Sequence, residues 1–163
     1  MSKKSGKFST FFLILLLLVG LSVMFYPIVS DWWNSKTQSR AVAAYQQAAN
    51  DLSDEEEAAI IERAREYNEE IAKLDFPFVD YDKVKGYDDI LDITGTGIMG
   101  YVSIPQIRVE LPIYHGTSEG VLNIAVGHLQ GSSLPVGGES THAVISAHRG
   151  LPSATLFSNL DKL

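Results

Sequence analysis

The chain has 163 residues, 45% hydrophobic and 20% charged, a composition typical of a folded protein rather than a disordered one. Twenty acidic against thirteen basic residues give a net charge of −7, which argues against nucleic acid as a partner because phosphates require a basic surface. No cysteine is present, so these residues provide no disulfide, no thiolate metal site and no thiol nucleophile.

An uncharged run, "FFLILLLLVGLSVMFYPIV" at residues 11–29, follows a short basic N-terminus at residues 1–10. Nineteen helical residues span roughly 28 Å, close to the thickness of a bilayer core. A cleaved signal peptide is the alternative, but its apolar region is usually shorter and ends in a small-residue cleavage site. We therefore predict a single-pass anchor in the cell membrane. The N-terminal lysines (Lys3, Lys4 and Lys7) would stay in the cytoplasm, and residues 31–163 would lie outside the cell.

Residues 30–74 are predicted to form a helical stalk, with helix expected from about Ser39. The stretch "SDEE" at Ser53–Glu56 is a capping box, in which the serine and the glutamate satisfy free backbone N–H groups. Beyond it, apolar residues recur at steps of three and four, which predicts one apolar stripe. Its members are Ile61, Ala64, Tyr67, Ile71 and Leu74. We expect this helix to pack on a neighbouring domain.

Residues 75–96 contain prolines, glycines and aspartates and are predicted to be a loop-rich linker. The apolar side chains among them (Phe76, Phe78, Val79 and Tyr81) are too numerous for a free linker. We therefore expect another part of the protein to receive them.

From residue 97 the pattern changes to short strands. "GIMGYVSIPQI" predicts a strand broken at Pro105, and "RVELPIYHG" predicts a second with Val109, Leu111 and Ile113 on one face. "TSEGVLNIAVGHL" predicts a short helical turn capped by Thr117 or Ser118. "HAVISAH" predicts a third strand, and "SATLFSNLDKL" the opening of an amphipathic helix. The expected fold is mainly β: an incomplete β-barrel at residues 97–163, preceded by the membrane helix and the stalk.

Four histidines are the candidate chemical groups: His115, His128, His142 and His148. In a straight strand, His142 and His148 would lie roughly 20 Å apart, too far to share a zinc ion, so no metal site is predicted. A serine hydrolase lacks support because no G-x-S-x-G elbow is present. By itself, a histidine that ends a strand is most often structural, and Arg149 is expected to form a surface ion pair.

Longer motifs identify a family. The segments "LPIYHGT", "GSSLPVGG" and "SAHRGLPSA" lie within a continuous match from about Gly97 to Leu163. This match closely resembles the class C sortases, the pilin-polymerising transpeptidases of Gram-positive bacteria.

The resemblance implies an eight-stranded β-barrel and a cysteine transpeptidase. The expected partners are an LPxTG-like sorting signal on a pilin or surface protein and the lysine amine of an acceptor subunit; no cofactor is expected. The family's catalytic histidine corresponds to His148, which would act as a general acid toward the leaving amine.

Two departures accompany the resemblance. The family's nucleophilic cysteine, in a T-L-x-T-C-like segment, and its following arginine have no counterpart before Leu163. We therefore expect an N-terminal part of a sortase that is inactive alone; a non-catalytic, membrane-tethered module that binds sorting signals is the alternative. The second departure is "DFPF" at Asp75–Phe78. It resembles the family's Asp-Pro-aromatic lid with one phenylalanine inserted, and a lid and plain interdomain packing both remain open for it.

Overall fold

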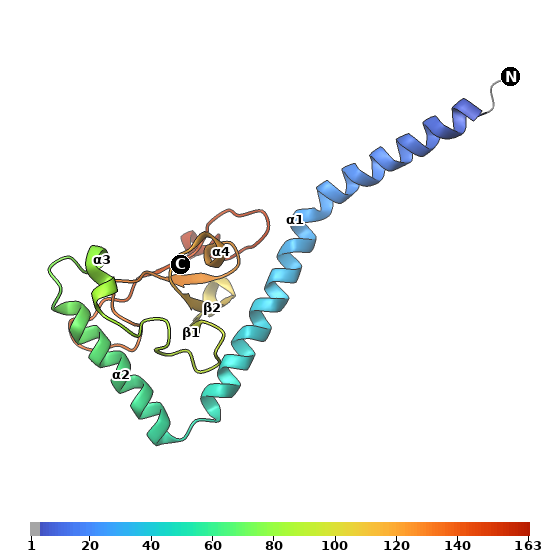
Figure 1. The fold of residues 1–163 in the computed structure, drawn as a ribbon. Helices are drawn as coiled ribbons and strands as arrows, with labels where there is room; N and C mark the ends of the chain where they lie inside the picture. Colours follow the sequence, from blue (N-terminus) through green and yellow to red (C-terminus); the bar gives the residue numbers. More distant parts are fainter. Residues whose placement is uncertain (1–3) are drawn as a thin grey trace.

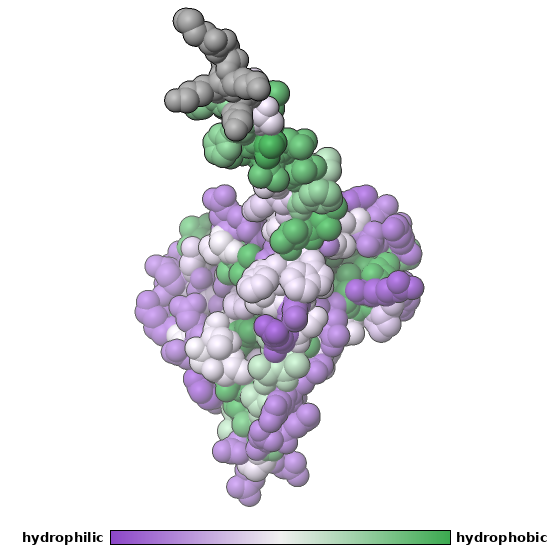
Figure 2. All heavy atoms as spheres, turned by 90° about the vertical axis from the view of Figure 1, so that its right-hand side faces the viewer, coloured by the Kyte–Doolittle hydropathy of each residue, from purple (hydrophilic) through white to green (hydrophobic). Residues whose placement is uncertain are grey.

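A computed structural model of the chain describes residues 4–163. Helix α1 runs without interruption from Lys4 to Asn50, and it is long and apolar enough to cross a membrane. Its most apolar window is not buried against the rest of the chain. Figure 1 shows this part of α1 extending away from the folded domain, and Figure 2 shows that its surface is hydrophobic. Lys3, one of the lysines used to predict the orientation, lies outside the described residues.

The second half of α1 and helix α2 (Asp54–Ala72) form two arms that meet at residues 51–53, with the sheet between them (Figure 1). The predicted capping box is confirmed: the Ser53 Oγ accepts from the Glu56 N–H, and the Glu56 carboxylate accepts from the Ser53 N–H at 2.9 Å. The predicted stripe is confirmed as well, since Ala64, Tyr67 and Ile71 are buried in the core.

A four-stranded sheet follows in the order β1-β2-β3-β4. Strands β1 (Ile98–Ile104) and β2 (Val109–His115) are antiparallel, β3 (Val126–His128) joins β2 in parallel, and β4 (Ile145–Ser146) joins β3 antiparallel. The 3₁₀ turn Pro105–Ile107 separates β1 from β2, so the predicted break in the strand at Pro105 is confirmed. Val109, Leu111 and Ile113 are all buried, so the predicted inward face of β2 is confirmed.

The shorter elements lie between these. Helix α3 (Pro77–Asp80) and a 3₁₀ turn (Tyr81–Lys83) occupy the linker, and helix α4 (Glu119–Leu122) connects β2 to β3. Ser118 is the N-cap of α4, one of the two caps predicted. A final 3₁₀ turn covers Leu160–Lys162.

The expectation of a mainly β fold is wrong for the described chain. Helices α1 and α2 contain 47 and 19 residues, whereas the four strands contain 7, 7, 3 and 2. Within residues 4–163 the sheet is open, because β1 and β4 are its two unpaired edges and do not close a barrel.

One further prediction is correct only in part, and another is wrong. "HAVISAH" contains β4, but only Ile145 and Ser146 belong to the sheet. Before them, the carbonyls of His142 and Val144 accept from the Ser133 and Leu129 N–H groups, whereas the His142 and Val144 N–H groups donate to the hydroxyls of Ser133 and Ser132 instead of to a neighbouring strand. "SATLFSNLDKL" forms turns instead of a helix, and the N–H of Thr155 donates to Asp31 of α1. Side chains that compete for backbone groups disfavour regular structure in this way.

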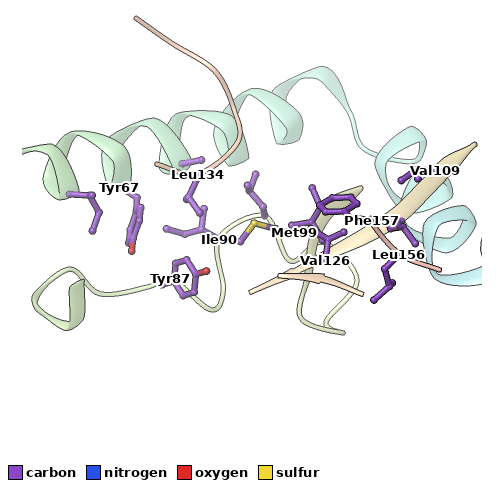
Figure 3. Packing of buried hydrophobic residues seen from close by; sticks show 14 of the residues in the cluster. Tyr67, Tyr87, Ile90, Met99, Val109, Val126, Leu134, Leu156 and Phe157 are labelled. Atoms are coloured by element: carbon purple, nitrogen blue, oxygen red, sulfur yellow. The ribbon is translucent and has the colours of Figure 1, made fainter. Parts of the chain in front are cut away.

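The core lies between α2, the linker and the sheet (Figure 3). Figure 3 shows Tyr67, Tyr87, Ile90 and Met99 in one continuous row that leads to Val126 and Phe157. Asn68 is the polar member of this interface: its amide donates to the Leu134 C=O at 3.2 Å and accepts from the Leu134 N–H at 2.6 Å. This pair of hydrogen bonds fixes α2 against the segment that precedes β4.

Candidate functional site

His148 lies two residues beyond β4 and is half-buried. Its Nδ1 is 2.7 Å from the carbonyl oxygen of Leu122, the last residue of α4. A carbonyl can only accept a hydrogen bond, so Nδ1 carries a proton. Among residues 4–163, the other ring nitrogen, Nε2, has no hydrogen-bond partner. The imidazole is therefore oriented through Nδ1, and Nε2 is available to bind or exchange a proton with another group.

The carbonyl that orients His148 is itself held in place by α4 and β3. Ser118 begins α4 with its hydroxyl accepting from the Val121 N–H. Gly127 of β3 lies directly under this turn, and a Cβ at position 127 would lie 3.2 Å from the Leu122 side chain and closer still to the backbone of Gly116. Only glycine lets β3 approach the backbone of Gly116 and Thr117, which leads into α4, this closely. Gly127 therefore allows β3 to pack tightly against the segment that leads into α4, and it was not identified from the sequence.

The residues after His148 form a closed loop. The Phe157 N–H donates to the His148 carbonyl at 3.2 Å, and the Gly150 N–H donates to Ser158 Oγ at 2.9 Å. Arg149 is exposed and lies 3.3 Å from Asp161. This is the surface ion pair expected of Arg149 from sequence, and it closes the base of the loop.

The other histidines lie elsewhere. His142 is exposed and is joined to Ser133 through its backbone. Both ring nitrogens of His115 face carbonyl oxygens, those of Gly97 at 3.0 Å and Ile90 at 2.8 Å, so His115 connects the end of β2 to the linker.

His128 is fully buried at the end of β3 and is part of a hydrogen-bonded network. Its Nε2 is 2.9 Å from the Ser133 carbonyl, and its Nδ1 is 2.9 Å from the hydroxyl of Tyr87. That hydroxyl also accepts from the Gly116 N–H at 2.9 Å. Burial lowers the pKa of His128 below its ordinary value, and burial likewise raises the pKa of Tyr87. Both groups are therefore neutral at pH 7, as structural groups in a core are.

Tyr87 was not identified from the sequence as part of any site. It lies in the predicted linker, and its position directly after Gly86 in "KGYDD" was the one available signal that a turn delivers an aromatic residue to the core.

The segment Asp75–Phe78 lies against the residues that follow β3. A Cβ at Gly131, whose φ is +96°, would lie 2.6 Å from the Pro77 carbonyl oxygen and 3.0 Å from the Phe78 Cα. The start of α3 therefore packs directly against the backbone of Gly131, where there is no room for a side chain. The aromatic side chains are nevertheless exposed, Phe76 by 67% and Phe78 by 55%. The expectation that another part of the protein receives them is not met within residues 4–163.

The part of the chain that contains His148 is similar to known proteins. Residues 102–163 match the sortase domain family. The chain is similar to sortase C1 from Streptococcus agalactiae, with 46% identity and a TM-score of 0.64 over 76% of this chain and 65% of that one. It is also similar to Clostridium perfringens sortase C, whose structure contains the C-terminal cell wall sorting motif, with 37% identity and a TM-score of 0.58 over 77% and 64% of the two chains.

A lid mutant of sortase A from Corynebacterium diphtheriae is similar as well, with 42% identity and a TM-score of 0.55 over 65% of this chain and 58% of that one. No curated protein matches the sequence. The chain spans less than two thirds of the length of these solved structures. Residues 102–163 thus carry a sortase domain match, and the structural neighbours of the chain include sortases C.

Proposed function

We propose that this chain is the N-terminal part of a membrane-anchored class C sortase, with residues 11–29 as anchor, 30–74 as stalk, 75–96 as linker and 97–163 as part of the catalytic barrel. The observation that carries the proposal is the geometry of His148. Its Nδ1 proton is held by the Leu122 carbonyl while Nε2 is available for proton transfer. The similarity to sortases C over three quarters of the chain supports the same assignment.

In the proposed reaction, a cysteine thiolate attacks the carbonyl carbon of threonine in an LPxTG-like sorting signal. The Thr–Gly C–N bond breaks, and the leaving glycine amine takes a proton from Nε2 of the His148 imidazolium. A lysine amine of an acceptor subunit then attacks the thioester, which forms an isopeptide bond, releases the thiolate and returns a proton to His148. The 163 residues contain no cysteine, so a segment outside this sequence has to supply the thiolate.

The anchored orientation is part of the proposal. The apolar part of α1 is exposed and long enough to span a bilayer, and "YPIVSDWWN" at its end lacks an A-x-A cleavage site. With residues 31–163 outside the cell, His148 lies on the side where surface proteins are joined.

A matched pair of substitutions in the complete protein tests the function. His148→Ala is expected to lower cleavage of an LPxTG peptide by about 10²- to 10⁴-fold, the usual contribution of general acid catalysis. His142→Ala, an exposed histidine six residues earlier, should leave cleavage near the unsubstituted rate. Equal activity of both variants would contradict the role of His148.

The isolated chain provides a second test. Purified residues 31–163 should not cleave the peptide above a buffer blank, because no thiolate is present in them. Saturable peptide binding without cleavage by the complete protein would favour the sorting-signal-binding module instead.

A further inference from the structure

Three polar residues of α1 connect the anchor helix to the folded domain: Asp31, Asn34 and Gln38. Their spacing of three and four residues places them on one face of the helix. Asp31 Oδ1 accepts from the Thr155 N–H at 2.7 Å and from its hydroxyl at 3.0 Å. Asn34 Nδ2 donates to the Ser153 carbonyl at 2.9 Å, and Gln38 Nε2 donates to the Ile124 carbonyl at 2.5 Å. We call this set the α1 polar stripe.

Both segments that the stripe binds also touch His148. Ile124 lies two residues after Leu122, whose carbonyl holds the His148 Nδ1. Ser153 and Thr155 belong to the loop that returns to His148 through the Phe157 N–H. The anchor helix therefore holds the two sides of the histidine site at once.

The stripe begins where the predicted membrane span ends. With a rise of about 1.5 Å per residue, Asp31 lies roughly 3 Å and Asn34 roughly 8 Å beyond Val29 along the helix. The headgroup layer on one side of a bilayer is about 5–8 Å thick, so both residues lie at headgroup depth. Trp32 and Trp33 beside them are 58% and 63% exposed, and exposed tryptophan is typical of this interface.

The loop after His148 also adjoins the apolar span itself. A hollow between loop and helix is lined on one side by Leu151 and Pro152 and on the other by Pro27, Ile28 and Trp32. Pro27 and Ile28 belong to the predicted span at residues 11–29, so this hollow lies beside the end of the span.

We propose that the α1 polar stripe is a positioning device that holds loop 149–158, and with it the His148 site, at the lipid headgroup layer. This inference rests on the proposed function for the anchor and for His148. Its partner is the phospholipid surface next to the loop. The stripe residues act through the loops and do not touch the reacting atoms. Because the His148 site is held at the headgroup layer, it acts on a bond presented at the membrane surface.

The absence of cysteine makes the depth of the loop directly measurable. The chain would be reconstituted into vesicles of phosphatidylcholine and phosphatidylglycerol that carry a nitroxide on the headgroup. A fluorophore would be attached through Pro152→Cys in the loop or, as the control, through Glu55→Cys at the far end of α1, where α2 begins. Both positions are exposed. We expect strong quenching at position 152 and little at position 55; equal quenching at the two positions would overturn the proposal.

Substitutions in the stripe test its role. The double variant Asp31→Leu, Asn34→Leu removes the bonds to Ser153 and Thr155, and it should lose most of the quenching at position 152. Asp31→Asn keeps an oxygen acceptor at the same place and should retain the quenching. Retention in the double variant would overturn the assignment to these residues, and an unchanged far-UV circular dichroism spectrum would exclude unfolding as the cause of a loss.

The quenching needs no catalysis, so it is independent of the proposed enzyme activity. A complete protein that fails to cleave the sorting peptide contradicts the proposed function, whereas the depth of the labelled loop decides the present inference.

Discussion

His128 is the last residue of β3 and His148 follows the neighbouring strand β4, yet the surroundings of the two side chains are opposite. His128 is fully buried, and both of its ring nitrogens lie within hydrogen-bond distance of Tyr87, Ser132 or Ser133. His148 is half-buried, and one ring nitrogen is bound to the Leu122 carbonyl. A desolvated ring with both nitrogens occupied joins parts of a core, whereas a ring oriented through one nitrogen can exchange a proton through the other.

The same contrast applies to the segments around them. The region of His128 is tied to α2 by buried bonds such as those between Asn68 and Leu134. The loop after His148 is held by exposed or partly exposed bonds, including that between Gly150 and Ser158. Unsatisfied polar groups cost much more free energy in a core than at a surface, so substitutions in the two regions should separate by their effects on stability.

The largest expected difference is between the two histidines. His128→Leu removes the ring partner of the Ser133 carbonyl and one of the three partners of the Tyr87 hydroxyl in a fully buried position, and it should lower the free energy of unfolding by about 2–5 kcal/mol. His148→Leu loses a single, partly exposed bond and should cost about 1 kcal/mol or less. Urea unfolding of the chain in detergent, followed by circular dichroism, measures both. Similar losses would show that His148 is a structural residue like His128.

A smaller difference is expected for the ties between segments. Asn68→Ala removes both bonds to the Leu134 backbone and should cost about 1–3 kcal/mol. Ser158→Ala removes the acceptor of the Gly150 N–H at a solvent-accessible site and should cost less than about 1 kcal/mol. The same unfolding assay applies, with Glu69→Ala as the control: Glu69 is the exposed neighbour of Asn68 on α2, and its replacement should change stability by no more than about 0.5 kcal/mol.

The smallest effect is a dependence of stability on pH. Burial, followed by the nearby charge of His115, lowers the pKa of His128, while its bond to the Ser133 backbone opposes the shift. In the window from the ordinary value of 6.5 down to the lowered pKa, the unfolded chain binds a proton that the folded chain excludes. Stability should therefore fall as the pH drops below 6.5 and level off above it.

Thermal unfolding across this range measures the effect of pH. His128→Gln should flatten the profile between pH 6.5 and the range where carboxylates titrate, near pH 4. His142→Gln, at an exposed histidine, should retain the slope of the unsubstituted chain. A flat profile for the unsubstituted chain would mean that His128 is not the group whose burial resists protonation.

The sequence alone was sufficient for features set by near neighbours in the chain. The capping box at Ser53 and Glu56, the stripe that buries Ala64 and Ile71, and the inward face of β2 depend on residues a few positions apart, and the structure has them as predicted. The motif "SAHRG" made His148 the candidate from sequence, and residues 102–163, which contain it, match the sortase domain family.

The tertiary structure decided what depends on distant residues. Only Ile145 and Ser146 of "HAVISAH" belong to the sheet, and two N–H groups before them donate to the hydroxyls of Ser132 and Ser133. The final segment lost its helix as Thr155 bound Asp31, 124 positions away. Likewise, the sequence does not predict the hydrogen bond between the Leu122 carbonyl and His148, or those that join His128 to Tyr87 and Ser133. Helix and strand patterns record local preferences, whereas these bonds exist only after packing has brought remote backbone and side-chain groups within 3 Å or so of one another.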